Sequence, residues 1–407
     1  MHELTLIRRF AFAAAWLPLF LLTSLAAASV ERIGADALTG TFTAVIVDNV
    51  PLVHTAQLLP LNRQGDLVGM DDAGAQIRQV IENLSRVLKA GGSGLDRVVK
   101  INICVANEDS MPKVQQALAS SFKGSNKPAV SFVAGKIAHE DALVAIDAVA
   151  TALPEGAARE VRWLRAPNVY QSPGIEHAAL LPAGPKIYIS GMADTNSLPE
   201  ATRKTLEKLV ATLGQLGGKK ADIVQLKAFL EPMSDLAAVR KEIVDYFAGT
   251  APPVVFVEWI SPSPNPPIEI ELIARARGDF SQETESVSFL TPPGTTSTKV
   301  FSRVARVNHG KLVYTSGLYG MKSQDAAGQV REIFNSLSGI LKQTGSDFEH
   351  LAKATYYVSD NDASNKLNDI RPEFYNPQRP PAASKAKVKS VAMPGKTVMM
   401  DMIAVTR

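Results

Sequence analysis

The chain has 407 residues, of which 46% are hydrophobic and 20% charged. This composition excludes a disordered chain and predicts two or three packed domains. The formal net charge of +3 at pH 7 is small and scattered, so charge alone does not indicate a nucleic-acid partner. The single cysteine, Cys104, excludes an intramolecular disulfide. It lies in an apolar alternation, and we interpret it as a buried small side chain rather than a nucleophile.

Residues 1–28 have the pattern of a secretory signal peptide. A short basic start precedes the apolar run FAFAAAWLPLFLLTSLAAA, and small residues follow it. We expect cleavage after Ala28 and export to the bacterial periplasm or medium, with no membrane attachment afterwards. The alternative is an uncleaved anchor, because the run is nearly long enough to span a bilayer. Arg8 and Arg9 indicate a twin-arginine route only faintly.

Three similar blocks then follow in chain order. Each begins with a strand-like run, seen in PLVHTAQLLP, KIYISGMAD and KLVYTSGLYG. An amphipathic helix, a Gly-bearing turn and a second strand come next, and the helices read IRQVIENLSRVLK, TRKTLEKLVATLG and VREIFNSLSGILK. Each block closes with a proline-flanked run and an apolar strand, ALVAIDAVA, PIEIELIAR or TVMMDMIAV. The order of these landmarks predicts three copies of one unit of about 120 residues.

The predicted units are 29–153, 162–278 and 300–407, with a polar linker at 279–299. Three such modules are either beads on a string or a compact body around a pseudo-threefold axis. The closing strands are apolar on both faces, which indicates sheets that are buried on both sides. This favours a pseudo-trimer, and we expect the single chain to be monomeric because it supplies all three units.

The ordered set FSRVARVNHGKLVYTSG, the helix–Gly–strand block, RPPAAS and MDMIAV resembles the YjgF/RidA family (endoribonuclease L-PSP-like). The resemblance implies an α+β fold of three chorismate-mutase-like domains, each with a mixed sheet and two helices, packed as a single-chain pseudo-trimer. It also implies ligand clefts between neighbouring units. Members of this family hydrolyse enamines and imines to 2-oxo acids and ammonia, and others are described as ribonucleases.

The family's carboxylate-binding arginine has no counterpart in this chain. Its position falls on Val130, Val254 and Ala383 in the three units. Losing a guanidinium removes a charged hydrogen bond of roughly 1.5–3 kcal/mol. The usual 2-imino acid deaminase activity is therefore in doubt. Lys385 is a candidate substitute anion contact, and the alternative is an ordinary surface lysine.

Other family positions survive in part. The Ser–Gly turn is kept as Ser190–Gly191 and Ser316–Gly317 but becomes Ala56–Gln57 in the first unit. The glutamate is kept only as Glu269, a candidate catalytic residue, and it is replaced by Ala145 and Met399 elsewhere.

The helix asparagine of the family is kept as Asn368 and becomes Gln115 and Arg240, and the family's aromatic is kept in type as Phe301. The candidate substrate-binding residues implied by the resemblance are Ser190, Gly191, Arg240, Phe301, Ser316, Gly317 and Asn368. Arg240 and Glu269 are a candidate charged pair for one cleft, and the alternative for Arg240 is a solvated helix position. A second acidic position persists as Asp147, Glu271 and Asp401, for which structural pairing is at least as good an interpretation as catalysis.

Three functional hypotheses remain. The first is an exported protein that binds a small metabolite, such as an imine, an enamine or a related compound, in an interdomain cleft without the usual deaminase activity. The second is an enamine or imine deaminase with a relocated substrate anchor. The third and weakest is a ribonuclease or RNA binder, because basic and aromatic residues are not interleaved. No metal-ligand spacing and no nucleotide-binding fingerprint is found, so neither a metal nor a cofactor is expected.

Overall fold

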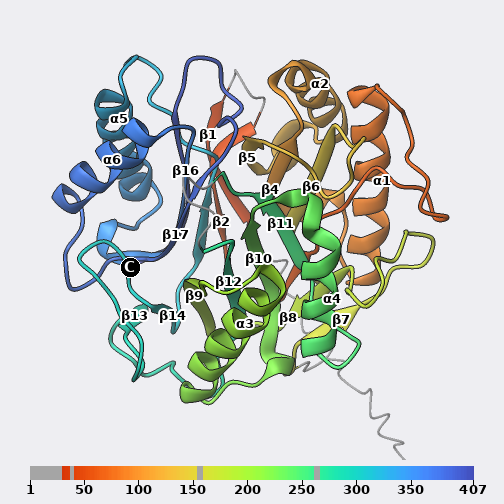
Figure 1. Ribbon diagram of the computed structural model, residues 1–407. Coiled ribbons are helices and arrows are strands. Elements are labelled where there is room, and N and C mark those ends of the chain that lie inside the picture. Colours follow the sequence, from red (N-terminus) through yellow and green to blue (C-terminus); the bar gives the residue numbers. More distant parts are fainter. Residues whose placement is uncertain (1–29, 37–40, 154–158, 261–265) are drawn as a thin grey trace, which may run out of the picture.

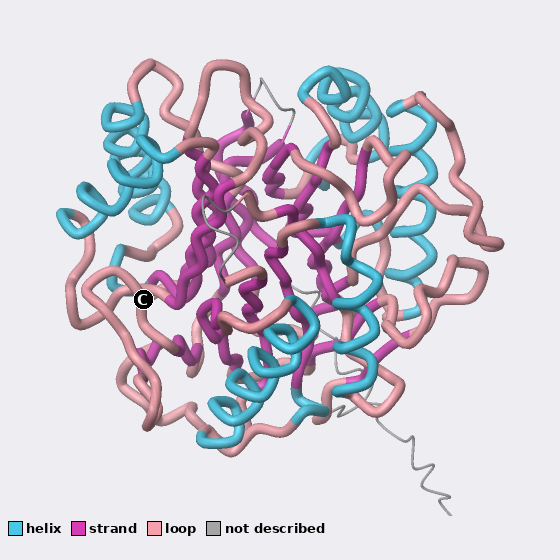
Figure 2. Tube along the Cα trace, in the orientation of Figure 1, coloured by secondary structure: helices cyan, strands magenta, loops and turns pink. Residues whose placement is uncertain are grey.

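A computed structural model describes residues 30–36, 41–153, 159–260 and 266–407. The predicted signal peptide, residues 1–28, lies outside this part of the chain. Within the described residues, the strands form three six-stranded sheets at the centre, and the helices lie around their outer side (Figures 1 and 2). The prediction of three α+β units in one pseudo-trimeric body is confirmed.

The three sheets repeat one strand order. The first sheet is β5–β4–β6–β3–β8–β7, the second is β11–β10–β12–β9–β14–β13, and the third is β17–β16–β18–β15–β2–β1. In each sheet, the first two strands of this order are parallel and the remaining neighbours are antiparallel.

The strands of the first sheet are β3 (Leu52–Thr55), β4 (Val98–Val105), β5 (Ala129–Ala134), β6 (Val144–Thr151), β7 (Arg162–Leu164) and β8 (Ala178–Leu181). Those of the second are β9 (Lys186–Ala193), β10 (Ile223–Leu230), β11 (Val254–Glu258), β12 (Ile268–Arg275), β13 (Val287–Leu290) and β14 (Val304–Val307). Those of the third are β15 (Leu312–Thr315), β16 (Leu351–Val358), β17 (Ala382–Lys387), β18 (Val398–Val405), β1 (Val30–Asp36) and β2 (Thr41–Val47).

The last two strands of each sheet come from outside the unit that supplies its other four strands. The pair β7–β8 opens the second unit but pairs with β3 of the first, and β14 of the third unit pairs with β9 of the second. The ring closes because β2, at the start of the first unit, pairs with β15 of the third. Strand β13 lies inside the segment 279–299 that the sequence predicts as a linker. The three sequence units are therefore interlocked by strand exchange.

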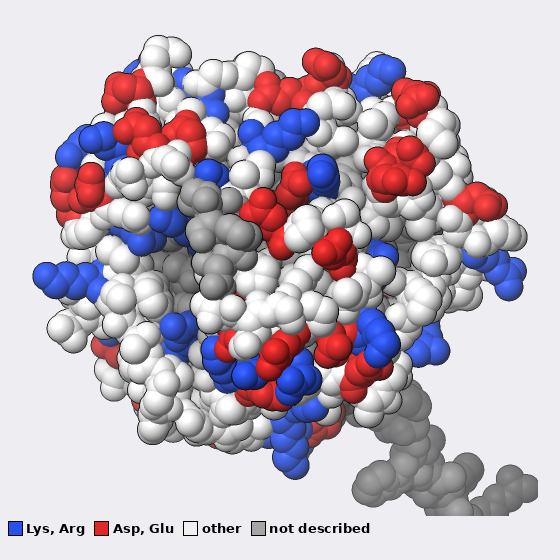
Figure 3. Space-filling model, viewed as in Figure 1, with Lys and Arg blue, Asp and Glu red and all other residues white. Residues whose placement is uncertain are grey.

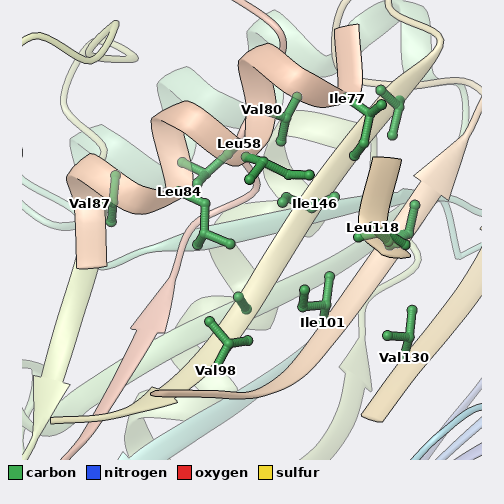
Figure 4. Packing of buried hydrophobic residues seen from close by; sticks show 14 of the residues in the cluster. Leu58, Ile77, Val80, Leu84, Val87, Val98, Ile101, Leu118, Val130 and Ile146 are labelled. Atoms are coloured by element: carbon green, nitrogen blue, oxygen red, sulfur yellow. The ribbon is translucent and has the colours of Figure 1, made fainter. Parts of the chain in front are cut away.

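Two helices cover each sheet. They are α1 (Ala73–Ala90) and α2 (Met111–Ser121), α3 (Leu198–Gln215) and α4 (Leu236–Tyr246), and α5 (Ala326–Gln343) and α6 (Asn361–Ile370). Helix α1 starts where the Asp72 carboxylate accepts a hydrogen bond from the Gly74 amide at 2.9 Å. Its apolar residues recur every three or four positions and face the first sheet, as Ile77, Val80, Leu84 and Val87 show (Figure 4). No helix in the described part of the chain has the length and apolarity that a bilayer crossing requires.

The inner faces of the three sheets meet around a charged centre. Lys100 on β4 pairs with Asp401 on β18 at 2.9 Å, and Lys353 on β16 pairs with Glu271 on β12 at 2.7 Å. These buried side chains join different units and border a cavity of about 40 Å³. The acidic residues Glu271 and Asp401 thus have the structural pairing role that the sequence left open. Asp147, the third of these acidic residues, accepts a hydrogen bond at 2.8 Å from the side-chain amide nitrogen of Asn102.

Candidate functional site

The Ser–Gly turns lie at the interfaces between neighbouring units, which we call seams. The Ser190 hydroxyl donates to Ser302 O at 2.6 Å and accepts from the Ala383 amide at 2.7 Å. The Ser316 hydroxyl likewise donates to Phe42 O at 2.7 Å and accepts from the Val130 amide at 2.8 Å. Both partners of each hydroxyl belong to another unit. The serines therefore connect neighbouring units, and the single O–H donor of each hydroxyl is committed to this contact.

In the first unit, the amide of Gln57 donates to Val254 O of the second unit at 3.0 Å, so the seam persists without a serine. There are three seams: one between the first and second units, one between the second and third, and one between the third and first. Each contains one of the positions at which the family's arginine is replaced: Val254, Ala383 and Val130 respectively.

Of the three equivalent positions Ala145, Glu269 and Met399, only Glu269 is a glutamate. It lies at the seam between the second and third units, which we call the Glu269 cleft. Its cavity of about 470 Å³ is bordered by Gly191, Glu269 and Arg303 among others. Arg303 directly precedes β14 and donates from Nη1 to Gly191 O at 2.8 Å and from Nε to Thr296 O at 3.2 Å. Among the described residues, Nη2 has no hydrogen-bond partner, so this nitrogen can donate to a ligand. The guanidinium carbon also lies 5.3 Å from the centre of the Phe301 ring.

Burial raises the pKa of Glu269 to about 7, and the negative charge of Glu271 adds to the rise. A hydrogen bond with Ser384 and the charge of Arg303 oppose it. Gly191 is needed here, because a Cβ at this position would lie 2.0 Å from Glu269 Oε1. The carboxyl group therefore packs directly against the turn, and it exchanges a proton near neutral pH.

A second cation, Lys385, is close enough to Glu269 to feel its charge but does not border the cavity. Lys385 on β17 donates to Ser364 Oγ at 2.8 Å and to Asn368 Oδ1 at 3.1 Å. Burial lowers its pKa to about 8, the charge of Arg371 contributes, and Glu269 opposes the fall. Asn368 thus positions Lys385, and this lysine is partly buried rather than free in solvent.

The structure separates several residues that the sequence grouped. Arg240 on α4 faces the seam between the first and second units, whereas Glu269 faces the third unit, so the two do not share a cleft. Ser316 and Gly317 lie at the seam between the third and first units, where Met399 occupies the glutamate position. A Cβ on Gly317 would lie 3.0 Å from the Met399 sulfur, so this seam is filled by an apolar side chain.

Arg303 was missed by the sequence reasoning. It is the third residue of FSRVA, two positions after Phe301, and a charged residue so close to the predicted cleft aromatic was an available signal. Its partner Glu269 belongs to another unit, which is why spacing along the chain did not connect them. Among the described residues, no group of three or more His, Cys, Asp or Glu side chains is arranged to hold a metal ion.

A family model described as Endoribonuclease L-PSP matches the chain three times, at residues 35–152, 177–276 and 295–406. The chain therefore belongs to this family, which includes the YjgF/Rid proteins. The 3-aminoacrylate deaminase RutC of Acinetobacter baylyi is 32% identical over 107 residues, which are 26% of this chain and 82% of RutC. Protein DfrA of Myxococcus xanthus is 27% identical over 114 residues, 26% of this chain and 85% of DfrA.

Solved structures match one unit at a time. The Rid-family protein YyfA of Yersinia pestis is 29% identical, with a TM-score of 0.24, and the match covers 30% of this chain and 99% of that protein. A putative endoribonuclease of Thermotoga maritima is 30% identical, with a TM-score of 0.24, over 30% of this chain and 96% of that protein.

Proposed function

We propose that the protein binds a small carboxylate-bearing metabolite in the Glu269 cleft. The observation that carries this proposal is the position of Arg303, whose guanidinium borders the cavity beside Gly191 and Glu269. A guanidinium with a free edge is the preferred protein group for a carboxylate. Arg303 would thus take the place of the arginine that is replaced by Ala383, and the nearby Lys385, which interacts electrostatically with Glu269, adds positive charge outside the cavity lining.

Hydrolysis of an imine or enamine acid is a second candidate, favoured by the pKa of Glu269 near 7. At that pKa the neutral acid donates a proton to the imine nitrogen, and the carboxylate takes a proton from the attacking water. Water adds to the C=N bond, and Glu269, protonated again, gives its proton to the amine nitrogen. The C–N bond then breaks, the carboxylate takes the proton of the former water's hydroxyl, and ammonia and a 2-oxo acid are released. The similarity to a 3-aminoacrylate deaminase supports this chemistry.

Two measurements on the mature protein distinguish these functions. Calorimetry with 2-oxobutanoate tests binding, and Arg303→Met is expected to weaken it by about 10- to 100-fold. Arg306→Met is a matched control, because Arg306 pairs with Glu283 at 3.2 Å and has its guanidinium over the Phe280 ring instead. An affinity for 2-oxobutanoate that is unchanged in Arg303→Met would refute the assignment of Arg303 as the carboxylate anchor.

The second measurement follows the hydrolysis of 2-iminobutanoate and 2-iminopropanoate generated in situ. Acceleration that is lost in Glu269→Gln supports the deaminase. Binding without acceleration of either imine leaves only the binding function.

We also propose an exported, monomeric protein that has no nucleic-acid partner. The sequence of residues 1–28 supports export, and mass spectrometry should show a mature chain that begins at Ser29. On the face shown in Figure 3, positive and negative side chains are interspersed, so this face offers RNA no extended basic surface. Light scattering should give the mass of one chain. The mass of three chains would contradict the interlocked pseudo-trimer.

A further inference from the structure

The cavity of the Glu269 cleft extends well beyond the proposed carboxylate anchor. Its volume of about 470 Å³ lies in the range that holds a drug-sized ligand, so a four-carbon acid at Arg303 fills only part of it. The remote part is bordered by helix α3, which lies beside β9 in Figure 1, and by residues 293–296 of the loop between β13 and β14. It therefore has room for the side chain of a longer ligand.

This remote part has polar walls. Thr212 and Gln215 border it from α3, and Thr295 and Thr296 border it from the loop. The side-chain amide of Gln215 donates to Pro293 O at 3.2 Å, which ties the loop to the helix. Because buried polar groups need partners, such walls favour a ligand that ends in a polar group over one that ends in an alkyl chain.

Lys208 supplies positive charge to the remote part. It and Arg303 are the cations that border the cavity, and Glu269 is the acid that borders it. Lys208 Nζ donates to Ala193 O at 2.9 Å and to Asp194 Oδ2 at 2.7 Å. An ammonium group has three N–H donors, and the third has no partner among the described residues. The two bonds hold the ammonium in place, so a ligand that binds it does not have to order a mobile side chain.

The two cations bind carbonyl groups of the same strand. Arg303 Nη1 donates to Gly191 O at 2.8 Å, and Lys208 donates to the carbonyl of Ala193, two residues further along β9. Since a strand rises about 3.3 Å per residue, these carbonyl groups lie about 6–7 Å apart. In an extended chain of five or six carbons, the terminal carbons lie about 5–6 Å apart. The spacing of the cations therefore suits the two carboxylates of such a chain.

The cation at this helix position is particular to the second unit. Lys208 is the eleventh residue of α3, and the eleventh residues of α1 and α5 are Asn83 and Ser336. In the first unit, Asn83 donates to Leu59 O at 3.1 Å, and Leu59 lies three residues after Ala56 as Ala193 lies three after Ser190. A neutral amide thus makes the equivalent contact there. The fold does not require a charge at this position, which leaves ligand binding as its role.

We propose that the Glu269 cleft is selective for dicarboxylates of five or six carbons, the 2-imino or 2-oxo derivatives of acidic amino acids. Arg303 binds the carboxylate next to the reacting carbon, and Lys208 binds the distal carboxylate. This inference rests on the proposed function of the cleft, and it adds a second anchor and a substrate class. A monocarboxylate of the same length uses only one of the two cations.

Calorimetric titration of the mature protein with 2-oxoglutarate tests this proposal, and 2-oxopentanoate serves as a ligand of the same chain length without the distal carboxylate. We expect 2-oxoglutarate to bind at least tenfold more tightly. Lys208→Met should weaken the binding of 2-oxoglutarate by about 10- to 100-fold and should leave that of 2-oxopentanoate unchanged. Lys204→Met is a matched control, because Lys204 lies one turn earlier on α3, pairs with Glu200 at 3.4 Å and does not border the cavity.

A double variant separates loss of the anchor from repulsion by Asp194. Lys208→Met leaves the Asp194 carboxylate without its lysine, whereas Lys208→Met/Asp194→Asn removes both charges. We expect the two variants to bind 2-oxoglutarate with the same reduced affinity. An affinity that returns to the wild-type value in the double variant would show that Lys208 only neutralises Asp194, and this would overturn its assignment as an anchor.

Equal affinity for the two ligands, or an affinity for 2-oxoglutarate that does not depend on Lys208, would also overturn the proposal. If 2-oxopentanoate still binds in that case and is weakened in Arg303→Met, the proposed function of the cleft stands without the second anchor. If neither ligand binds, both proposals fail. Circular dichroism and the melting temperature of each variant establish that the fold is retained.

Discussion

Replacing Gly191 by alanine should displace the carboxyl group of Glu269. The new Cβ would lie 2.0 Å from Oε1, 2.4 Å from Cδ and 2.6 Å from Cγ of that side chain. Because carbon and oxygen approach no closer than about 3.3 Å, the carboxyl group must move by about 1.3 Å or more. Overpacking of this kind costs about 1–3 kcal/mol of unfolding free energy, and a misplacement of about 1 Å lowers a dependent reaction rate by about 100-fold.

Gly317→Ala is the matched control at the equivalent turn of the third unit. Its Cβ would meet the Met399 sulfur at 3.0 Å and Cγ at 3.2 Å, and a flexible thioether can rotate away. Carbon-13 NMR of glutamate-labelled protein should show one carboxyl group with a midpoint near pH 7 in the wild type and in Gly317→Ala. In Gly191→Ala that midpoint should move toward the ordinary glutamate value. A midpoint that stays near 7 in Gly191→Ala would refute the close packing of the turn on Glu269.

Three further predictions concern the charges and the interlocked sheets. Lys100→Met should lower the free energy of unfolding, measured in denaturant, by about 3–5 kcal/mol, because it leaves Asp401 buried and unpaired. The double variant Lys100→Met/Asp401→Leu should regain part of the lost unfolding free energy. A loss below about 1 kcal/mol would contradict a buried pair. Since burial raises the folded pKa of Glu269, the stability it contributes is present below pH 4.5 and is lost as the pH rises through about 7. The unfolding free energy of the wild type relative to Glu269→Gln should thus fall by about 3 kcal/mol over that range, and a flat difference would argue against the raised pKa. Deleting residues 30–47 removes β1 and β2 and uncovers the edge of β15, so light scattering should show association between chains, which a monodisperse monomer would contradict.

Much of the fold follows from local pattern. The helix periodicity of α1, α3 and α5 and the order of landmarks were enough to predict three units and their helices, since amphipathic spacing reports directly which face is buried. The exchange of strands was not predictable from this pattern. A hairpin-like connection such as that between β14 and β15 suggests that the two strands pair with each other, whereas β14 pairs with β9. Pairing partners depend on the packing of the whole ring rather than on turn residues.

The candidate site was predicted less completely, because each cleft combines residues from two units. Glu269 and the Ser190–Gly191 turn were recognised within one repeat, but Arg303 comes from the next repeat. Lys100 and Lys353 interrupt apolar strands, and a lysine at such a position is a sequence signal for a buried ion pair. Their acidic partners lie on strands of other units, so only the assembled ring connects them.

The most direct test of the proposed function is a crystal structure of the mature protein with 2-oxobutanoate. We expect the ligand in the Glu269 cleft, with its carboxylate accepting hydrogen bonds from Arg303 Nη2 and with its carbonyl carbon facing Glu269. A ligand bound at another seam, or in this cleft with its carboxylate directed away from Arg303, would contradict the assignment of Arg303 as the substrate anchor.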